Sequence, residues 1–165
     1  MLIAPLLPYL SKVAAPTVFG ISGYSGAGTT TGSKPKISPE SLSGGIKPYS
    51  LTDHIHEREA GYHLGRLLVP AKDDFKIAFV PSVAPWFQGI LSTLSAPLEH
   101  EMRASEVRAL FEEMYKGNKL VKIQSEVPEI KDAAGRHGVT IGGFQVHSSG
   151  KRVVAVVSRS HHVVG

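Results

Sequence analysis

The sequence predicts an α+β fold: a mixed, mostly antiparallel sheet with helices on one face. The expected strands outnumber the expected helices, and the two kinds do not alternate strictly along the chain as they do in α/β proteins. The chain has 165 residues, of which 42% are hydrophobic and 19% charged, which is enough for one domain with its own core. We find no internal repeat and no linker that would divide it.

The first half of the chain is expected to form two helices and one strand. Residues 2–14 are mostly apolar up to Pro16, which predicts a helix. Residues 17–22 are β-branched and apolar, which predicts a strand. Residues 23–45 are rich in Gly, Ser, Thr and Pro, and a loop of this length is usually functional or mobile. A second helix is expected over 54–68, because these apolar residues fall on one face at helical spacing: Ala60, Leu64, Leu67 and Leu68.

The second half is expected to supply most of the sheet. Ser105 is a candidate N-cap for a helix over 105–115 that ends at Gly117. A turn at Pro81–Pro85 is expected to separate the first two strands, and Ser148–Gly150 reads as a hairpin turn. The expected strands are 75–80, 87–94, 119–123, 138–147 and 152–158.

Composition and charge exclude several classes of function. Eighteen basic against 14 acidic residues give a net charge of +4, without a basic run typical of nucleic-acid binding. The apolar N-terminus is interrupted by Pro5 and Pro8 and reaches Lys12 too soon to span a membrane. The chain contains 0 Cys, so it has no disulfide, no thiolate metal site and no thiol nucleophile of its own.

The first motif is the glycine-rich segment Gly20–Gly32. Small residues allow the backbone to approach a ligand and expose its N–H groups, which suits a phosphate or carboxylate. It is not a Rossmann fingerprint, because Thr31 stands where the third glycine belongs and no helix follows. It is not a P-loop either, because no Gly-Lys-Ser/Thr follows. An ordinary Gly/Ser turn remains the alternative.

The second motif is His54-Ile55-His56-Glu57-Arg58-Glu59 at the start of the expected second helix. Two histidines two positions apart point in different directions from a regular helix, so they would share a metal only if the first one were non-helical. No convincing third ligand lies nearby, and we expect no metal site. A histidine at a helix N-terminus tends to stay neutral, as a general base requires, and Glu59 could orient His56. The alternative is that these are exposed capping residues.

The third motif runs from Pro81 to Leu91, and by itself it indicates a turn followed by a strand, with Trp86 as a core or interface aromatic. Taken in order, the three motifs resemble N-acetyl-γ-glutamyl-phosphate reductase of arginine biosynthesis. The family's Ser-Gly-x-Ser-Gly-Ala-Gly appears as Ser22–Gly28, its His-x-His-x-x-Glu as His54–Glu59, and its Pro-x-x-x-Pro-x-x-x-Gly-Ile-Leu as Pro81–Leu91. The amino-acid sequence of the glycine segment is most similar to that of the fungal form, which is made as part of a mitochondrial precursor.

The resemblance implies a fold like the C-terminal domain of glyceraldehyde-3-phosphate dehydrogenase and a site for an acyl phosphate. In the family a cysteine thiolate displaces phosphate, and NADPH then reduces the thioester to the semialdehyde. By this analogy His56 is the catalytic acid/base. His54 and Glu59 belong to the substrate site, and Ser25, Gly26 and Ala27 lie near the nicotinamide. The resemblance also implies an oligomeric full-length enzyme in the mitochondrial matrix.

The departures from the family define what this chain lacks. The family's cysteine and its nucleotide-binding domain, which holds most of the NADP, precede the region matched here. Residues 1–157 therefore correspond to a substrate-binding and dimerisation domain, and 158–165 form a divergent tail. Thr29 and Ile55 stand where bacterial members often have arginine. We expect an isolated chain without cysteine to show no turnover. The alternative function is a non-catalytic module that binds a small anion or pairs with another protein.

Overall fold

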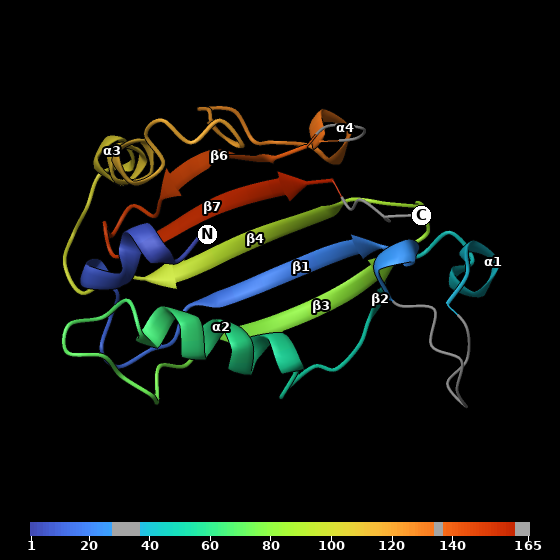
Figure 1. Ribbon diagram of the computed structural model, residues 1–165, viewed down its shortest axis with the longest axis horizontal. Coiled ribbons are helices and arrows are strands. Elements are labelled where there is room, and N and C mark those ends of the chain that lie inside the picture. Colours follow the sequence, from blue (N-terminus) through green and yellow to red (C-terminus); the bar gives the residue numbers. More distant parts are fainter. Residues whose placement is uncertain (28–36, 134–136, 161–165) are drawn as a thin grey trace.

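The computed structural model describes residues 1–27, 37–133 and 137–160. Within these ranges one seven-stranded sheet has the order β2-β3-β1-β4-β7-β6-β5 (Figure 1). Its strands are β1 (Thr17–Gly23), β2 (Lys47–Pro48), β3 (Ala78–Ala84), β4 (Ile90–Pro97), β5 (Val121–Ile123), β6 (Val139–Val146) and β7 (Arg152–Arg159). The pairs β1–β3 and β5–β6 are parallel, and the other pairs in these ranges are antiparallel. The predicted mixed, mostly antiparallel sheet is confirmed.

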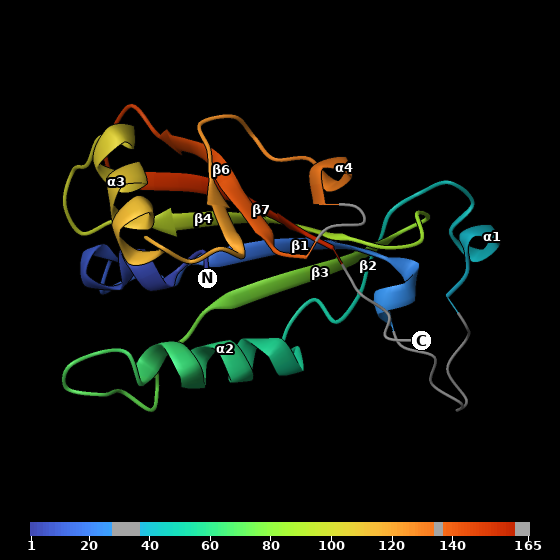
Figure 2. The same ribbon diagram turned by 45° about the horizontal axis from the view of Figure 1, so that its top comes forward.

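Helices cover one face of this sheet. The α-helices are α1 (Pro39–Leu42), α2 (Ile55–Gly65), α3 (Ala104–Met114) and α4 (Ile130–Ala133), and the 3-10 helices are η1 (Ala4–Tyr9) and η2 (Tyr24–Ala27). Figure 2 shows α2 alongside β3 near one edge and α3 near β6 toward the other. Among the residues described, no helix has both the length and the apolar character needed to cross a membrane.

The core lies between the sheet and η1, α2 and α3. Side chains alternate along a strand, so one face of β4 presents Leu94 and Ala96, which lie opposite Ala155 and Val153 of β7. These four side chains are buried, and they pack in one cluster with residues from all three helices: Leu6 of η1, Leu64 of α2, and Val107 and Phe111 of α3. A single continuous core therefore anchors the sheet and its helices.

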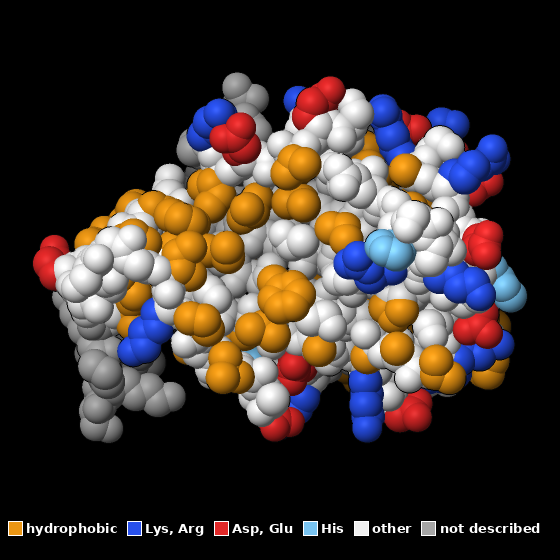
Figure 3. All heavy atoms as spheres, turned by 180° about the vertical axis from the view of Figure 1, so that it is seen from behind, with side chains coloured by type: hydrophobic (Ala, Val, Ile, Leu, Met, Phe, Trp, Pro, Cys, Tyr) orange, Lys and Arg blue, Asp and Glu red, His pale blue; other side chains and the backbone are white. Residues whose placement is uncertain are grey.

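The alternate positions of the same strands form the opposite, open face of the sheet. Phe19 is paired with Thr93 on β4 and with Val80 on β3, and it is 48% exposed. Seen from behind, hydrophobic side chains gather over much of this face (Figure 3). We define the open face by these partly exposed residues: Phe19, Ile21, Val80, Leu91, Thr93 and Val154.

The N-terminal segment differs from the sequence prediction. The helix expected over 2–14 is only the 3-10 helix Ala4–Tyr9, which contains Pro8. Pro8 has no N–H to continue an α-helical ladder, and Leu10 is extended (φ −67°, ψ 146°) and forms a bridge with Leu98. Buried Leu2, Ile3 and Leu6 still hold the segment in the core.

Strands β3 and β4 also differ from the prediction. They were expected at 75–80 and 87–94, with a turn at Pro81–Pro85, but β3 runs through Pro81 and the connection between the strands lies at 85–89. Ala78 N donates to Pro16 O on the β1 side. Because successive residues of a strand point their backbone groups to opposite sides, those of Phe79 and Pro81 face away from β1. The missing N–H of Pro81 therefore costs no β1–β3 hydrogen bond. The short elements α1, β2 and α4 were not predicted.

Helix α3 offers a test of the core. Phe111 is fully buried and lies 4.9 Å from Phe144 between ring centroids, whereas Met114 on the same helix is 51% exposed. Removing the Phe111 ring leaves a cavity that the close-packed core fills only partly, so we expect Phe111→Ala to lower the free energy of unfolding by about 3–5 kcal/mol. The measurement is urea denaturation followed by circular dichroism. Met114→Ala is the control, and an equal loss for both variants would contradict this description of the core.

Candidate active site

The second motif forms the entry to helix α2. Asp53 adopts a left-handed backbone (φ 59°), and His54 follows as the N-cap with an extended backbone (φ −62°, ψ 142°). The helix then begins at Ile55, close to the predicted start, and ends at Gly65, earlier than the predicted 68. We call residues 53–59 the histidine turn. Its backbone places His54 outside the helix and His56 inside the first helical turn.

His54 caps the helix with its own ring. Its Nδ1 accepts a hydrogen bond from the backbone N–H of His56 at 3.1 Å. A ring nitrogen accepts only when it carries no proton, so this bond puts the proton of a neutral His54 on Nε2. Tyr49 and Phe79 contact the ring edge to face, with centroids 5.8 and 5.3 Å away. Burial first, and the neighbouring His56 second, hold the pKa of His54 below its ordinary value of 6.5.

His56 is oriented by a carboxylate. Its Nδ1 lies 2.6 Å from Oε2 of Glu59, one helical turn further on, and both side chains are more than half exposed. An ionised carboxylate can only accept, so it holds a proton on Nδ1 and leaves Nε2 of a neutral His56 with a free lone pair. The predicted pairing of Glu59 with His56 is thus present, and it gives His56 the geometry of a general base.

The two histidine rings lie together with opposite hydrogen-bonding characters. Their centroids are 4.8 Å apart, because the N-cap position frees His54 from the helical direction that would have separated them. In the neutral state His54 offers a donor at Nε2, and His56 offers an acceptor at its own Nε2. Such a pair can hold one oxygen of a ligand while moving a proton to or from a neighbouring atom.

Phe79 joins the histidine turn to the glycine segment. Its ring contacts both histidine rings, at 5.3 and 6.2 Å between centroids. The same ring lies against Gly20 of β1, where an added Cβ would stand 2.8 Å from the ring. Gly20 therefore keeps the surface of β1 low enough for Phe79 to lie across it.

The candidate cofactor residues Ser25, Gly26 and Ala27 lie in η2, which follows β1 directly. The third motif holds this corner: Gly23 N donates to Gly89 O, and Tyr24 N and Ser25 N donate to Trp86 O and Phe87 O. Ser25 Oγ is buried and has no hydrogen-bond partner among the described residues, and the same is true of Trp86 Nε1. Gly28 and Thr29 lie outside the described ranges, so the glycine motif is seen only up to Ala27.

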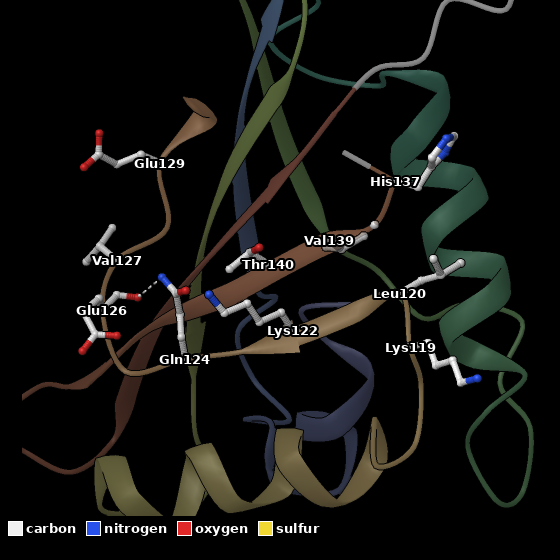
Figure 4. Close-up of a pocket in the computed structure, with 11 residues that line it drawn as sticks. Lys119, Leu120, Lys122, Gln124, Glu126, Val127, Glu129, His137, Val139 and Thr140 are labelled. Carbon is white, nitrogen blue, oxygen red and sulfur yellow. Dashed lines mark hydrogen bonds between the residues drawn. The ribbon is translucent and has the colours of Figure 1, made fainter. Parts of the chain in front are cut away.

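A separate cavity of about 440 Å³ lies at the other end of the sheet (Figure 4). Its walls come from β5, β6 and the chain that follows β5, and the Lys122 side chain points into it (Figure 4). Lysines and glutamates both line it: Lys119, Lys122, Glu126 and Glu129. None of its lining residues belongs to the three motifs. The strand order places it away from β3, where the histidines lie.

Three further residues contribute to the histidine site in ways that the sequence did not predict. Tyr49 and Phe79 enclose the ring of His54, and Glu57 accepts a hydrogen bond from Phe79 N. Phe79 stands between the apolar residues Ala78 and Val80, so the sequence alone does not show which face of the sheet its ring occupies. Within residues 1–27, 37–133 and 137–160, no cluster of three or more potential ligands could hold a metal ion.

Comparison with known families identifies the chain. The family model described as semialdehyde dehydrogenase, dimerisation domain, matches residues 1–159. The chain therefore belongs to the semialdehyde dehydrogenase dimerisation-domain family.

Three relatives narrow the resemblance. Protein arg-6, mitochondrial, of Neurospora crassa is 49% identical over 92% of this chain and 16% of that protein. Protein arg11, mitochondrial, of Schizosaccharomyces pombe is 47% identical over 93% of the chain and 16% of that protein. N-acetyl-gamma-glutamyl-phosphate reductase of Xanthomonas axonopodis pv. citri is 40% identical over 99% of the chain and 48% of that protein. The resemblance drawn from the motifs is confirmed, and the chain spans less than half of each of these relatives.

Solved structures agree with the fold. Aspartate semialdehyde dehydrogenase II of Vibrio cholerae, in complex with ASA, superposes with a TM-score of 0.66 over 96% of this chain and 52% of that one, at 13% identity. The enzyme from Francisella tularensis gives 0.67 over 96% of this chain and 56% of that one, also at 13% identity. At this identity the likeness concerns the fold, and it confirms the predicted architecture.

The cap made by His54 predicts a dependence of stability on pH. The pKa of His54 is lower in the folded than in the unfolded chain, so the unfolded chain binds more protons as pH falls below 6.5. The contribution of the cap is complete above pH 6.5 and is lost as pH falls through the folded pKa. We expect His54→Asn, which keeps a strong N-cap without a titrating group, to lose less stability than the wild type between pH 7 and pH 5. Urea denaturation at both values measures this, and parallel losses would refute the role of His54 as a titrating cap.

Proposed function

We propose that this domain forms one wall of the active site of a reductase that converts N-acetyl-glutamyl 5-phosphate into N-acetyl-glutamate 5-semialdehyde in arginine biosynthesis. The observation that carries the proposal is the pair of histidines with opposite Nε2 characters, one of them oriented by Glu59 at 2.6 Å. The name of the Xanthomonas relative supports the choice of substrate, and the match to it covers 99% of this chain.

His56 is the acid/base residue in this proposal. In the reaction a thiol bonds to the acyl carbon, phosphate leaves with its bridging oxygen, and hydride then reduces the resulting thioester, which puts negative charge on the acyl oxygen. Nε2 of neutral His56 first takes the proton of the attacking thiol. It then gives this proton to the acyl oxygen, and takes it back when the carbon–oxygen double bond is restored and the thiolate leaves. His54 donates a hydrogen bond from its Nε2–H to an oxygen of the substrate and thereby orients the acyl group. The chain contains 0 Cys, so the nucleophilic thiol is supplied from outside this sequence.

The cofactor in this proposal is NADPH, which supplies a hydride when bound. Few residues of this domain fit contact with it: Ser25 has a buried hydroxyl without a partner, and Gly26 beside it is exposed and has no side chain. Ser25, Gly26 and Ala27 would hold only the reactive end of the cofactor, because the glycine segment lacks the spacing that cradles a dinucleotide phosphate. The mitochondrial relatives support a place in the mitochondrial matrix.

The partner in this proposal is a second copy of the same chain, paired through the open face. The family is described as a dimerisation domain, and the open face presents contiguous apolar side chains opposite the core. Exposed apolar patches of this kind mark interaction sites in soluble proteins. Pairing through the open face leaves the histidine turn, on the other side of the sheet, accessible to substrate.

The catalytic assignment predicts unequal effects for the two histidines. In a full-length protein that contains this domain, His56→Ala removes proton transfer and is expected to lower turnover by about 10²–10⁴-fold. His54→Ala is expected to act mainly through a raised KM and the lost helix cap. Steady-state measurement of NADPH oxidation checks both variants. Small, equal effects would return both histidines to the role of exposed capping residues.

The proposed interface predicts a change of oligomeric state. Phe19→Glu places a charge in the middle of the open face, so we expect the dimer to dissociate to monomers at micromolar concentration. Val69→Glu is the matched control, because Val69 is 99% exposed in the loop after α2 and lies outside the open face. Sedimentation equilibrium measures both variants. If Phe19→Glu associates as the wild type does, the open face is not the interface.

A further inference from the structure

One hydrogen bond joins the histidine turn to the sheet. The backbone N–H of Phe79 on β3 donates to Oε1 of Glu57 in the first turn of α2 at 2.7 Å, in a partly buried position. The bond crosses 22 residues of sequence, so it fixes tertiary structure and not only a local turn. A charged acceptor makes such a bond short and comparatively strong.

The edge of β3 explains why this bond is needed. Among the described residues, β2 pairs with β3 only at Lys47 and Pro48, opposite Val83 and Ser82, so the first half of β3 has no described strand beside it on that side. Phe79 N–H faces away from β1, and Glu57 is the group that satisfies it. An unpaired N–H at a sheet edge costs free energy and invites pairing with another chain.

The bond also lies next to the catalytic candidates. Glu57 follows His56 directly in the sequence. Glu57 binds the backbone of Phe79, and the Phe79 ring contacts both histidine rings. The other end of α2 is anchored in the core through Leu64. The first turn of α2 is therefore held against the sheet by the side chain of Glu57 and by the packing of the histidine and phenylalanine rings.

We propose that Glu57 is a positioning residue: its carboxylate fixes the histidine turn on the edge of β3 and so sets the placement of His54 and His56 over Phe79. The structural part stands on its own geometry. Its consequence for turnover rests on the function proposed above.

Two substitutions separate geometry from charge. Glu57→Gln keeps an oxygen that can accept the Phe79 N–H but removes the negative charge, whereas Glu57→Ala removes both. Glu106→Ala is a matched control: Glu106 stands in the first turn of α3, another helix of 11 residues, and accepts the backbone N–H of Arg103 at 2.7 Å. That bond stays within its own helix turn and is remote in sequence from the histidines.

Nuclear magnetic resonance on this chain tests the structural part. In Glu57→Ala we expect amide exchange of Phe79 to accelerate on the order of tenfold, the loss of one hydrogen bond to a charged group. We also expect the His54 ring protons to shift as they leave the Phe79 ring. Glu57→Gln is expected to keep both signals near those of the wild type, and Glu106→Ala to leave them unchanged.

Two outcomes would overturn the proposal. Unchanged Phe79 exchange and His54 ring shifts in Glu57→Ala would mean that the bond does not place the turn. If Glu57→Ala does not fold, Glu57→Gln becomes the test of the proposal. A protected Phe79 amide together with displaced His54 signals in Glu57→Gln would mean that Glu57 acts through its charge and not through placement.

Turnover of a full-length protein that contains this domain tests the consequence. We expect Glu57→Ala to lower kcat about tenfold through the displaced His56 and to raise KM through the displaced His54, and Glu57→Gln to restore most of both. The two proposals fail differently. If His56→Ala leaves turnover intact while the magnetic resonance result holds, the function is wrong and the positioning stands. If His56→Ala abolishes turnover but Glu57→Ala moves no signal, only the positioning is wrong.

Discussion

The site depends on the way Phe79 occupies the edge of β3. Its backbone belongs to the strand, its N–H is bound by Glu57, its ring lies on Gly20 of β1, and the same ring supports His54 and His56. Strand, helix and glycine segment therefore meet at one residue. Each contact is individually modest, but together they support, at the sheet edge, two side chains that differ in hydrogen-bonding character.

The two histidines show how neighbouring groups divide one kind of side chain into two roles. Both rings are imidazoles, both are near the same helix terminus, and their centroids are only 4.8 Å apart. What separates them is the partner of Nδ1: a backbone N–H for His54 and a carboxylate for His56. The partner selects which nitrogen carries the proton, and this selects which ring can donate and which can accept at Nε2.

The sheet, its mixed character and the helical cover follow from patterns that the sequence carries locally. Periodicity identified α2 and α3, and the order of three motifs identified the family. The exact course of β3 could not be predicted from the sequence, because a proline inside an apolar run usually ends a strand. Only the strand pairing shows that the backbone nitrogen of Pro81 faces away from β1, where the β1–β3 pair needs no N–H. The contacts of Glu57 and Tyr49 were equally out of reach, since they depend on which strand lies at the edge.

Strand β1 carries the two sides of the molecule on consecutive residues. Phe19 belongs to the open face, while Gly20 beside it supports Phe79 beneath the histidines. Because side chains alternate, the open face and the support for the histidines draw on the same seven residues of β1, each at a spacing of two. Substitutions can therefore alter one property without the other. A one-residue insertion or deletion within β1, in contrast, exchanges the two faces. A side chain at Gly20 or Gly23 would also meet other atoms at 2.8 Å, so β1 is expected to tolerate changes of residue type only away from these glycines, and no change in length.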